Sequence, residues 1–514
     1  MTIPLPIHHT SQLMKNCDRP WIKTGICTVV ISAISGALFA QEPPAIEWAY
    51  THGDLVELFS VRELADGGFI ATGIVYPDSA ANANILLLRL SSTGAFLWEA
   101  TAGGLDGDVA RAVRPTPDGG FIVAGHTFSS ELDGYHAMSD GYVVKFDSVG
   151  VVEWAKCLGG SSGDGLNAVE LASDGGYLVA GYTYSVNGDL SGDPAQYNDI
   201  WVTRLNGEGE PLWSRSLGGV AWESAWAMDQ TADESTVVIG ITYSNDGDVD
   251  GNHSAEVGDM WFIKLDGAGT LDSQHCFGGT EGDVGTCLQQ TPDGGYVLIG
   301  STYSNDGDVS SAHGDRDVWI LKLDEQEQIL WQRCVGGSDS DEAWSVRQTL
   351  DGGYIAAGMT YSDDGDLTGH DCLDSTWIVK FDGEGLLQWQ MCLNIDSDNP
   401  EAMIEQVSDG GYVLVHGGGE VFKLEGEGGA GLQEVPFRGL GFEMAPNPCA
   451  GMLTISGGSS QASIVIADLQ GRRLLEPRSA GSRTSIDLSH WPRGVYLVTL
   501  RSPGGSMSKR LVLE

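Results

Sequence analysis

One short sequence, Asp-Gly-Gly, recurs through most of this 514-residue chain. Copies begin at Asp66, Asp118, Asp174, Asp293, Asp351 and Asp409, and a degenerate copy, Asp-Glu-Ser, begins at Asp233. Successive copies lie 52, 56, 59, 60, 58 and 58 residues apart. A unit of this length cannot bury an apolar face alone, so neighbouring units must stack on one another. The repeat therefore predicts an array of seven similar units.

Each unit contains four short runs rich in Val, Ile, Tyr, Trp and Thr, bounded by Gly and Asp. Such runs predict β-strands, and no segment has the apolar spacing of a helix. The fourth run carries Trp98, Trp154, Trp213, Trp331 or Trp389, with Ser273 in the fourth copy. Four antiparallel strands in a unit of about 40–60 residues predict a β-propeller blade. The alternative is a solenoid, whose coils are usually shorter, about 20–30 residues.

The two ends of the array complement each other. The seventh copy has second and third runs at 412–417 and 420–426 but lacks a Trp-marked run. Residues 44–50, before the first copy, place Trp48 in a run of this type. We expect the N-terminal strand to complete the seventh blade, because ring closure removes exposed strand edges. The prediction is an all-β fold: a seven-bladed β-propeller over 41–428, followed by a small C-terminal β-sandwich.

The net charge limits the classes of partner that the chain can bind. The chain has 27 basic and 71 acidic residues, a net charge of −44. Residues 41–436 hold 15 of the basic and 65 of the acidic residues, a net −50. Binding to nucleic acid needs a basic face, so nucleic acid is excluded as a partner. The same charge argues against electrostatic docking to anionic lipid.

The N-terminus has the pattern of an export signal. Lys15, Arg19 and Lys23 precede an apolar stretch at 24–40 that ends in Ala40. This order is typical of a secretory signal peptide, predicted here over residues 1–40, and a start at Met14 would make its leader more typical. The alternative is a transmembrane anchor, which normally needs about 20 more uniformly apolar residues. We expect no such anchor.

The C-terminus has a different composition, net +4 over 437–514. Its alternating apolar runs are broken by Pro, Gly and Asp. The segment 442–514, after a linker at 429–441, resembles the C-terminal sorting domain of the type IX secretion system of Bacteroidota. The matching residues are Pro446-Asn447-Pro448, Gly451, Asp468, Gly471-Arg472, Leu488, Gly494-Val495-Tyr496 and Lys509-Arg510.

This resemblance implies export by the Sec route and passage across the outer membrane, with the type IX machinery as partner. It also implies that the tail is cleaved and that the product is released or linked to the cell surface. The body resembles the acidic DGGY-repeat propellers that such bacteria secrete, a family whose activity is mostly unassigned.

The loops between second and third runs carry the candidate metal ligands. In the loop NDGDVDGN, Asp246, Asp248 and Asp250 alternate before Gly251. Alternating carboxylates before a Gly favour Ca²⁺, as at the start of an EF-hand loop, although Val257 stands where a bidentate Glu is expected. Weaker candidates in equivalent loops are Asp189, Asp306, Asp308, Asp364 and Asp366. The alternative is a solvated turn in which Asn, Asp and Gly supply the geometry.

Two further residue sets have competing interpretations. Cys157, Cys276, Cys334 and Cys392 each lie three residues past the Trp position, which favours thiols packed between blades. A Cys276–Cys287 disulfide is the alternative. The extra aromatics Trp222, Trp226 and Trp344 suit blade packing better than a sugar-binding surface. The repeated basic position, which includes Lys145 and Lys380, is expected to pair with nearby carboxylates.

The sequence offers no catalytic or cofactor-binding residue beyond a candidate Ca²⁺ site. The copies differ mainly in loop length, whereas a catalytic ring should converge unique residues on one face. His126 and His136, in the second copy, are the one clustered exception. We therefore expect a secreted or cell-surface binding protein with a glycan or protein ligand, rather than an enzyme. The alternative is a polysaccharide hydrolase or lyase built on the propeller.

Overall fold

The computed structural model describes residues 43–52, 56–76, 82–190, 197–254, 256–367, 372, 375–393, 399 and 401–426. Toward the C-terminus it describes 443–445, 452–456, 462–468, 473–480, 483–491, 493–502 and 505–513. The predicted signal peptide and linker lie outside these residues. Among the described residues, no helix has the length and apolar character needed to cross a membrane.

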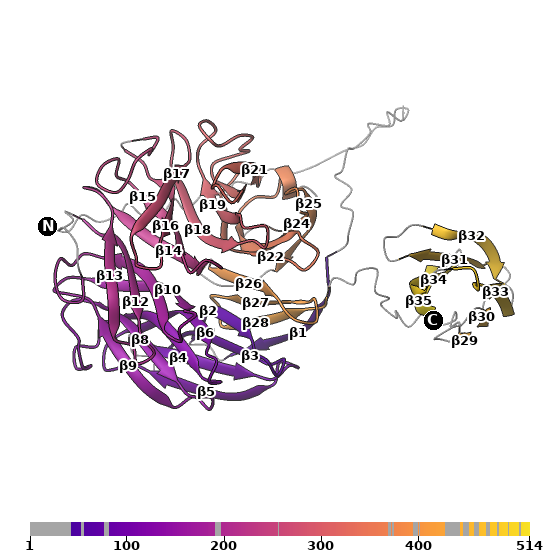
Figure 1. The fold of residues 1–514 in the computed structure, drawn as a ribbon, viewed down its shortest axis with the longest axis horizontal. Helices are drawn as coiled ribbons and strands as arrows, with labels where there is room; N and C mark the ends of the chain where they lie inside the picture. Colours follow the sequence, from indigo (N-terminus) through magenta and orange to yellow (C-terminus); the bar gives the residue numbers. More distant parts are fainter. Residues whose placement is uncertain are drawn as a thin grey trace, which may run out of the picture. The chain divides into compact units, whose positions relative to one another are not determined.

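Seven four-stranded antiparallel sheets form the blades of a β-propeller (Figure 1). Blade 1 contains β2 (Val56–Glu63), β3 (Phe69–Val75), β4 (Asn84–Leu90) and β5 (Phe96–Ala102). Blade 2 contains β6 (Asp108–Pro115), β7 (Phe121–Thr127), β8 (Asp140–Phe146) and β9 (Val152–Leu158). Blade 3 contains β10 (Asp164–Leu171), β11 (Tyr177–Thr183), β12 (Asp199–Leu205) and β13 (Pro211–Leu217). The predicted blade count and strand content are confirmed.

The next three blades repeat this order. Blade 4 contains β14 (Glu223–Gln230), β15 (Thr236–Thr242), β16 (Asp259–Leu265) and β17 (Leu271–Phe277). Blade 5 contains β18 (Asp283–Gln290), β19 (Tyr296–Thr302), β20 (Asp317–Leu323) and β21 (Ile329–Val335). Blade 6 contains β22 (Asp341–Gln348), β23 (Tyr354–Thr360), β24 (Ser375–Phe381) and β25 (Leu387–Leu393), with a short 3₁₀ helix η1 (Gly365–Leu367) in its loop.

The seventh blade is made from both ends of the array. It contains β26 (Ala402–Gln406), β27 (Tyr412–His416), β28 (Glu420–Leu424) and, as its outer strand, β1 (Ile46–Thr51). Strand β1 pairs antiparallel with β28, with Tyr50 opposite Val421. The predicted completion of the last blade by the N-terminal strand is confirmed.

The Asp-Gly-Gly turn joins the first and second strands of each blade. In blade 1, the Asp66 carboxylate accepts a hydrogen bond of 3.0 Å from Gly68 N, and Gly67 has a φ of +77°. A positive φ favours glycine, which explains why the repeat retains it. In the degenerate copy, Glu234 adopts the same left-handed conformation with a φ of +67°. That copy is therefore a true member of the repeat.

The turn carboxylate also neutralises a buried cation on the third strand. Lys380, only 1% exposed, places Nζ 2.9 Å from Asp351 Oδ2. Equivalent pairs join Arg89 to Asp66, Lys145 to Asp118, Arg204 to Asp174, Lys264 to Asp233, Lys322 to Asp293 and Lys423 to Asp409. A buried charge needs such a partner. The predicted pairing of the repeated basic position is confirmed.

The hydrophobic core lies between neighbouring blades. One cluster joins Leu178 and Val202 of blade 3 to Met228, Trp261 and Ile263 of blade 4, all buried. Trp201, Trp319 and Trp377 occupy the position of Trp261 in other blades and are also fully buried. Because every blade packs both its faces in this way, each inter-blade space becomes a separate apolar layer.

The C-terminal segment forms two antiparallel sheets of its own. One contains β29 (Glu443–Ala445), β30 (Met452–Ser456) and β33 (Arg483–Asp487). The other contains β31 (Ala462–Asp468), β32 (Arg473–Ala480), β34 (Gly494–Ser502) and β35 (Gly505–Leu513), in the order β32-β31-β34-β35. The predicted all-β character of this segment is confirmed.

Candidate functional site

A cavity of about 130 Å³ is lined by residues from all seven blades. The lining comes from the first strands of the blades (β2, β6, β10, β14, β18, β22 and β26) together with Glu401, just before β26. These strands surround the middle of the propeller in Figure 1. The cavity is therefore the central channel of the propeller.

In six blades, a β-bulge turns one residue of the first strand toward this channel. In blade 4 the register shifts between Ala225 and Ala227, and the extra residue, Trp226, lines the cavity. The six residues at this place are Phe59, Arg111, Asn167, Trp226, Thr286 and Trp344, which we call the bulge ring. A bulge re-aims a side chain without ending the strand. The bulge ring is thus where this repetitive fold places residues that differ between copies.

Two members of the bulge ring form an aromatic pair. The rings of Trp226 and Trp344 meet edge to face, with centroids 5.8 Å apart and an interplanar angle of 77°. Both indole Nε1 atoms are buried and have no hydrogen-bond partner among the described residues. The expectation that these two residues serve blade packing is wrong, because the bulge moves them from the inter-blade layer into the channel. Trp222, outside the lining, instead packs against Tyr243 at 5.5 Å.

Arg111 supplies the charged part of the bulge ring. Its Nη1 donates to both oxygens of Glu401, at 2.9 and 2.8 Å, and its guanidinium lies 4.8 Å from the Phe59 ring centroid. Its Nε is buried without a partner among the described residues. The channel therefore combines an aromatic surface with unused hydrogen-bond donors.

A second ring of polar residues stands three positions beyond the bulge ring in blades 1–6, with Glu405 at the equivalent place in blade 7. The other six members are Arg62, Arg114, Glu170, Asp229, Gln289 and Arg347. Arg62 pairs with Glu405 at 3.2 Å, and Arg114 pairs with Glu170 through two hydrogen bonds. Burial lowers the pKa of Arg62 to about 9, with the positive charge of Arg114 acting in the same direction.

Arg347 differs from the other arginines of this ring. Its Nη1 donates to Cys287 Sγ at 3.0 Å and to the Val346 carbonyl oxygen at 2.7 Å. Within the described part of the chain, no carboxylate lies within ion-pair distance of it. Arg62, Arg114, Arg347 and Cys287 all line the cavity. At the cavity, Arg62 and Arg114 are thus held in ion pairs, whereas Arg347 has no direct carboxylate partner among the described residues and interacts with the charges of Glu405 and Asp229 at longer range.

The two histidines of the second repeat have separate partners. His126 is largely buried, 5.7 Å from Phe128, and burial lowers its pKa to about 4, assisted by the charge of Arg111. His136 instead lies 2.9 Å from Asp140. Neither lines the cavity. They do not form the convergent pair that a catalytic site would need.

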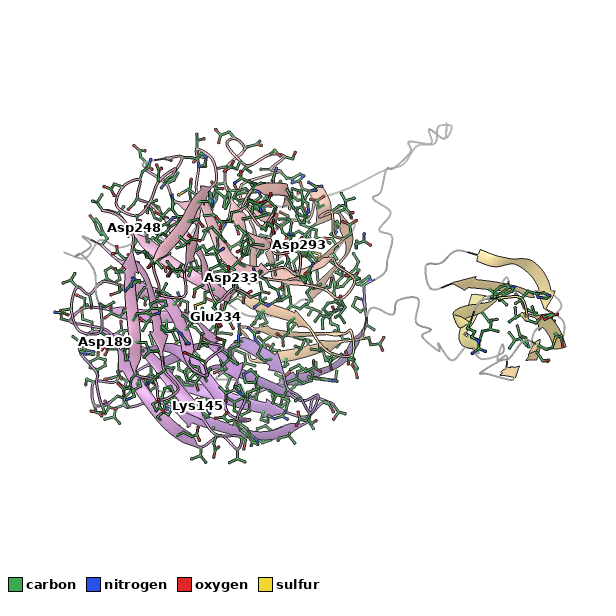
Figure 2. All side chains as sticks on the ribbon, in the orientation of Figure 1. Lys145, Asp189, Asp233, Glu234, Asp248 and Asp293 are labelled. Carbon is green, nitrogen blue, oxygen red and sulfur yellow. A yellow bond between two sulfur atoms is a disulfide. The ribbon has the colours of Figure 1, made fainter. Side chains whose placement is uncertain are left out.

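The candidate Ca²⁺ ligands contact the turns between blades. Asp246 Oδ1 accepts from Val220 N at 2.9 Å, and Asp248 Oδ2 accepts from Gly218 N at 3.3 Å. Asp250 uses its carbonyl oxygen, which accepts from Gln274 Nε2 at 3.0 Å. The weaker candidates behave alike: Asp189 with Gly159, Asp306 with Thr280, Asp308 with Gly278, Asp364 with Ser338 and Asp366 with Gly336. In Figure 2, Asp189 and Asp248 lie toward the edge of the propeller.

These contacts give the loops a structural role. In the residues that the structure describes, no group of three or more His, Cys, Asp or Glu side chains is arranged to hold a metal ion. The assignment of Ca²⁺ to the loop of Asp246, Asp248 and Asp250 stays a prediction.

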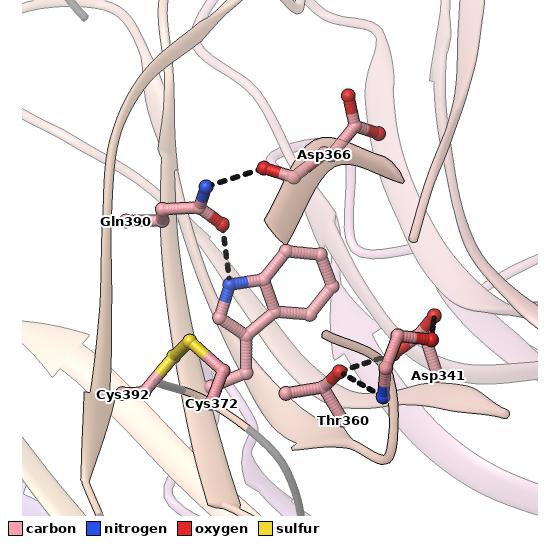
Figure 3. The surroundings of a disulfide bond; sticks show 8 residues. Asp341, Thr360, Asp366, Cys372, Gln390 and Cys392 are labelled. Atoms are coloured by element: carbon pink, nitrogen blue, oxygen red, sulfur yellow. Dashed lines mark hydrogen bonds between the residues drawn. A yellow bond between two sulfur atoms is a disulfide. The ribbon is translucent and has the colours of Figure 1, made fainter. Parts of the chain in front are cut away.

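A buried carboxylate at the start of the first strand was not expected from the sequence. Asp341 accepts a hydrogen bond from Thr360 Oγ1 (Figure 3). It also accepts from Ser362 Oγ at 2.9 Å and from Gly337 N at 2.8 Å. The equivalents are Asp108, Asp164, Glu223 and Asp283. A repeated Thr-x-Ser, 19 residues after each carboxylate in these blades, is the sequence signal that would have found them.

The cysteines agree with the thiol prediction at three positions and differ from it at Cys392. Cys372 and Cys392 form a disulfide, with Cα atoms 5.3 Å apart (Figure 3). Cys392 is therefore not a packed thiol, and Cys276 and Cys287 are both free. Cys372 lies in a loop that differs between copies, so the repeat gave no partner for Cys392. The predicted thiols at Cys157, Cys276 and Cys334 are confirmed, and burial raises the pKa of each to about 12.

The fold and the C-terminal segment define the class of protein: a β-propeller protein with a type IX secretion sorting domain. Residues 443–514 match the family described as Secretion system C-terminal sorting domain. This domain indicates secretion across the outer membrane to the surface or the medium, and implies interaction with the type IX machinery. No curated protein matches the chain.

Three solved structures illustrate how distant the similarity to known structures is. A protein of unknown function from Bacteroides caccae is 15% identical, covering 56% of this chain and 85% of its own, with a TM-score of 0.33. PorZ, a surface component of the type IX secretion system of Porphyromonas gingivalis, is 12% identical, covering 89% and 70%, with a TM-score of 0.31. Virginiamycin B lyase from Staphylococcus aureus is 8% identical, covering 74% and 99%, with a TM-score of 0.46.

Proposed function

We propose that this protein is a secreted or cell-surface binding protein whose ligand site is the central channel. The Trp226–Trp344 pair is the observation that carries this proposal. Two indoles at a cavity, each with a buried N–H lacking a partner in the described chain, form a surface that a ligand ring can stack on and hydrogen-bond to. A buried donor without a partner costs free energy, which a bound acceptor recovers.

The lining favours binding over catalysis. Glycoside hydrolysis by acid–base chemistry commonly uses two carboxyl groups that flank the scissile bond. The cavity lining contains one carboxylate, Glu401, and Arg111 already holds both its oxygens. The polysaccharide hydrolase or lyase alternative therefore has less support than a binding function.

A glycan array tests the proposal. The purified secreted protein is compared with Trp226→Ala and Trp344→Ala, and with Trp222→Ala as a control that removes an indole outside the lining. We expect binding that both channel variants weaken by at least about tenfold and the control leaves unchanged. Signals that none of the three substitutions alters, or an array without any signal, would overturn the proposal.

Processing belongs to the same proposal. We propose that the mature form begins near Gln41 and ends near 436–445, because a signal pattern and a sorting tail flank the propeller. The acidic repeat supports placing the body among the DGGY-repeat propellers. Intact-mass analysis of the secreted protein tests the processing. A surface species that retains Lys509-Arg510 would count against removal of the tail.

A further inference from the structure

The cavity gathers guanidinium groups from an acidic body, and carboxylates pair with three of them: Glu401 with Arg111, Glu405 with Arg62 and Glu170 with Arg114. Residues 41–436 carry a net −50 with only 15 basic residues. Four of these 15, namely Arg62, Arg111, Arg114 and Arg347, line the cavity with a single carboxylate, Glu401. Seven of the others hold the Asp of a blade turn. The channel thus brings together four of the guanidinium groups of this acidic body.

The side-chain groups at the cavity that lack a hydrogen-bond partner are all donors. Among its lining residues, the buried side-chain atoms without a partner are Trp226 Nε1, Trp344 Nε1 and Arg111 Nε. All three are donors, so the ligand must offer acceptors. Arg347 adds a guanidinium whose Nη1 contacts a thiol and a carbonyl oxygen instead of a carboxylate.

On the basis of the proposed binding function, we propose that the channel binds the acidic end of a saccharide, a sugar ring carrying a carboxylate. The apolar face of the ring lies against the Trp226–Trp344 pair, and the carboxylate lies toward Arg347. A guanidinium matches a carboxylate with two parallel hydrogen bonds, which a neutral hydroxymethyl group cannot accept in the same way.

The size of the cavity fits the end of a chain. Its volume, about 130 Å³, is below the roughly 300–1,000 Å³ of sites that enclose a drug-sized ligand. A terminal uronate residue therefore fits better than an extended internal segment. The high negative charge of the body repels such a ligand elsewhere on the surface, so selectivity depends on this cavity.

Calorimetric titration tests this inference with two matched pairs of probes: methyl β-D-glucuronide against methyl β-D-glucoside, and methyl β-D-galacturonide against methyl β-D-galactoside. Ionic strength is kept equal throughout. We expect at least one uronide to bind about tenfold or more tightly than its neutral partner. Arg347→Gln should remove this preference, whereas Arg347→Lys, which keeps the charge but loses the paired geometry, should retain part of it.

Arg333→Gln is the matched control. Arg333 lies on the outer strand β21, contacts the Glu384 carbonyl oxygen and stacks on Trp331 outside the cavity. The Arg333→Gln variant loses one positive charge, as Arg347→Gln does, so a general effect of charge would appear in both variants. Thermal melting of each variant separates a local loss from misfolding.

The outcomes separate the inference from the proposed function. Equal binding of a uronide and its neutral partner, both lost in Trp226→Ala, would overturn the acidic ligand class and leave the channel as the site. A uronide preference that Arg347→Gln leaves intact would overturn the placement of the carboxylate. Absence of binding to all four probes would overturn the inference, and absence of any signal on the glycan array as well would overturn the proposed function.

Discussion

Trp48, in the strand that the N-terminus contributes to blade 7, packs edge-on against Phe69 of blade 1, with ring centroids 5.4 Å apart and an interplanar angle of 63°. Its backbone pairs with Lys423 of β28 in blade 7. A single strand thus completes the last blade and contacts the first. The ring is held closed at this point by side-chain packing as well as by backbone hydrogen bonds.

Deleting residues 41–50 should destabilise the whole ring instead of fraying one end. The deletion exposes the edge of β28 and removes the aromatic contact to Phe69. We expect a melting temperature lower by several degrees, or aggregation, measured by calorimetry and light scattering. Unchanged melting of the shortened protein would show that β1 contributes little to closure.

Stability should fall as pH rises from about 4 to about 6. Burial raises the pKa of Asp283 to about 6, and the nearby charge of Asp259 acts in the same direction. Since an unfolded Asp titrates near 3.9, the folded protein binds more protons than the unfolded protein in this window, and the free energy of unfolding decreases with pH. Two pKa units correspond to roughly 3 kcal/mol for this group.

Asp283→Asn tests this assignment. The amide keeps an oxygen that can accept from Gly279 N but does not titrate. Chemical denaturation from pH 4 to pH 7 should give a flatter stability profile for this variant than for the wild type. Asp272→Asn, at an exposed position of β17, is the control and should keep the wild-type slope. Equal slopes in all three proteins would contradict the assignment.

The Ca²⁺ prediction concerns the loop of Asp246, Asp248 and Asp250. A cation held only by the folded protein stabilises it by about 2.7 kcal/mol at a hundredfold excess over Kd. Chelation should lower the melting temperature, and Asp248→Asn should remove most of that response. Mg²⁺ at equal ionic strength is the control, because it screens charge similarly but fits a flexible oxygen loop poorly. Equal stabilisation by both ions would identify the loops as solvated turns.

The Cys372–Cys392 disulfide should contribute to stability in an oxidising environment. It links residues 20 apart, and closing a loop of this length stabilises by roughly 3 kcal/mol when the unfolded chain is constrained. Adding a reductant should lower the melting temperature of the wild type and have no effect on Cys392→Ser. Identical melting temperatures of the wild type with and without reductant would show that the disulfide does not contribute to stability.

The repeat predicted the fold well because propeller geometry is local. The position of Asp351 two residues before Gly353 fixes a turn, and turns at regular spacing fix four-stranded blades. Ring closure through Trp48 was also predictable, because the seventh repeat lacks a Trp-marked strand and an extra strand of this type precedes the first repeat. The pairing of Lys380 with Asp351 follows from the same regularity.

The site was less predictable because it depends on departures from regularity. Trp226 and Trp344 reach the channel through β-bulges, and a bulge leaves no clear mark in a strand of alternating residues. Trp226 and Trp344 are also far apart in the sequence, so the sequence alone does not show that the rings of these two residues, on blades 4 and 6, are in contact. The disulfide was missed for a related reason, because Cys372 lies in a loop outside the repeat pattern.

Hydrogen–deuterium exchange with a ligand identified on the array locates the binding surface in the intact protein, and so tests directly whether the channel is the site. If the channel is the site, the ligand should slow exchange in β14 and β22, around Trp226 and Trp344, and should leave exchange in the loop of Asp246, Asp248 and Asp250 unchanged. Slower exchange confined to that loop and its equivalents in other blades, with β14 and β22 unaffected, would contradict a channel site.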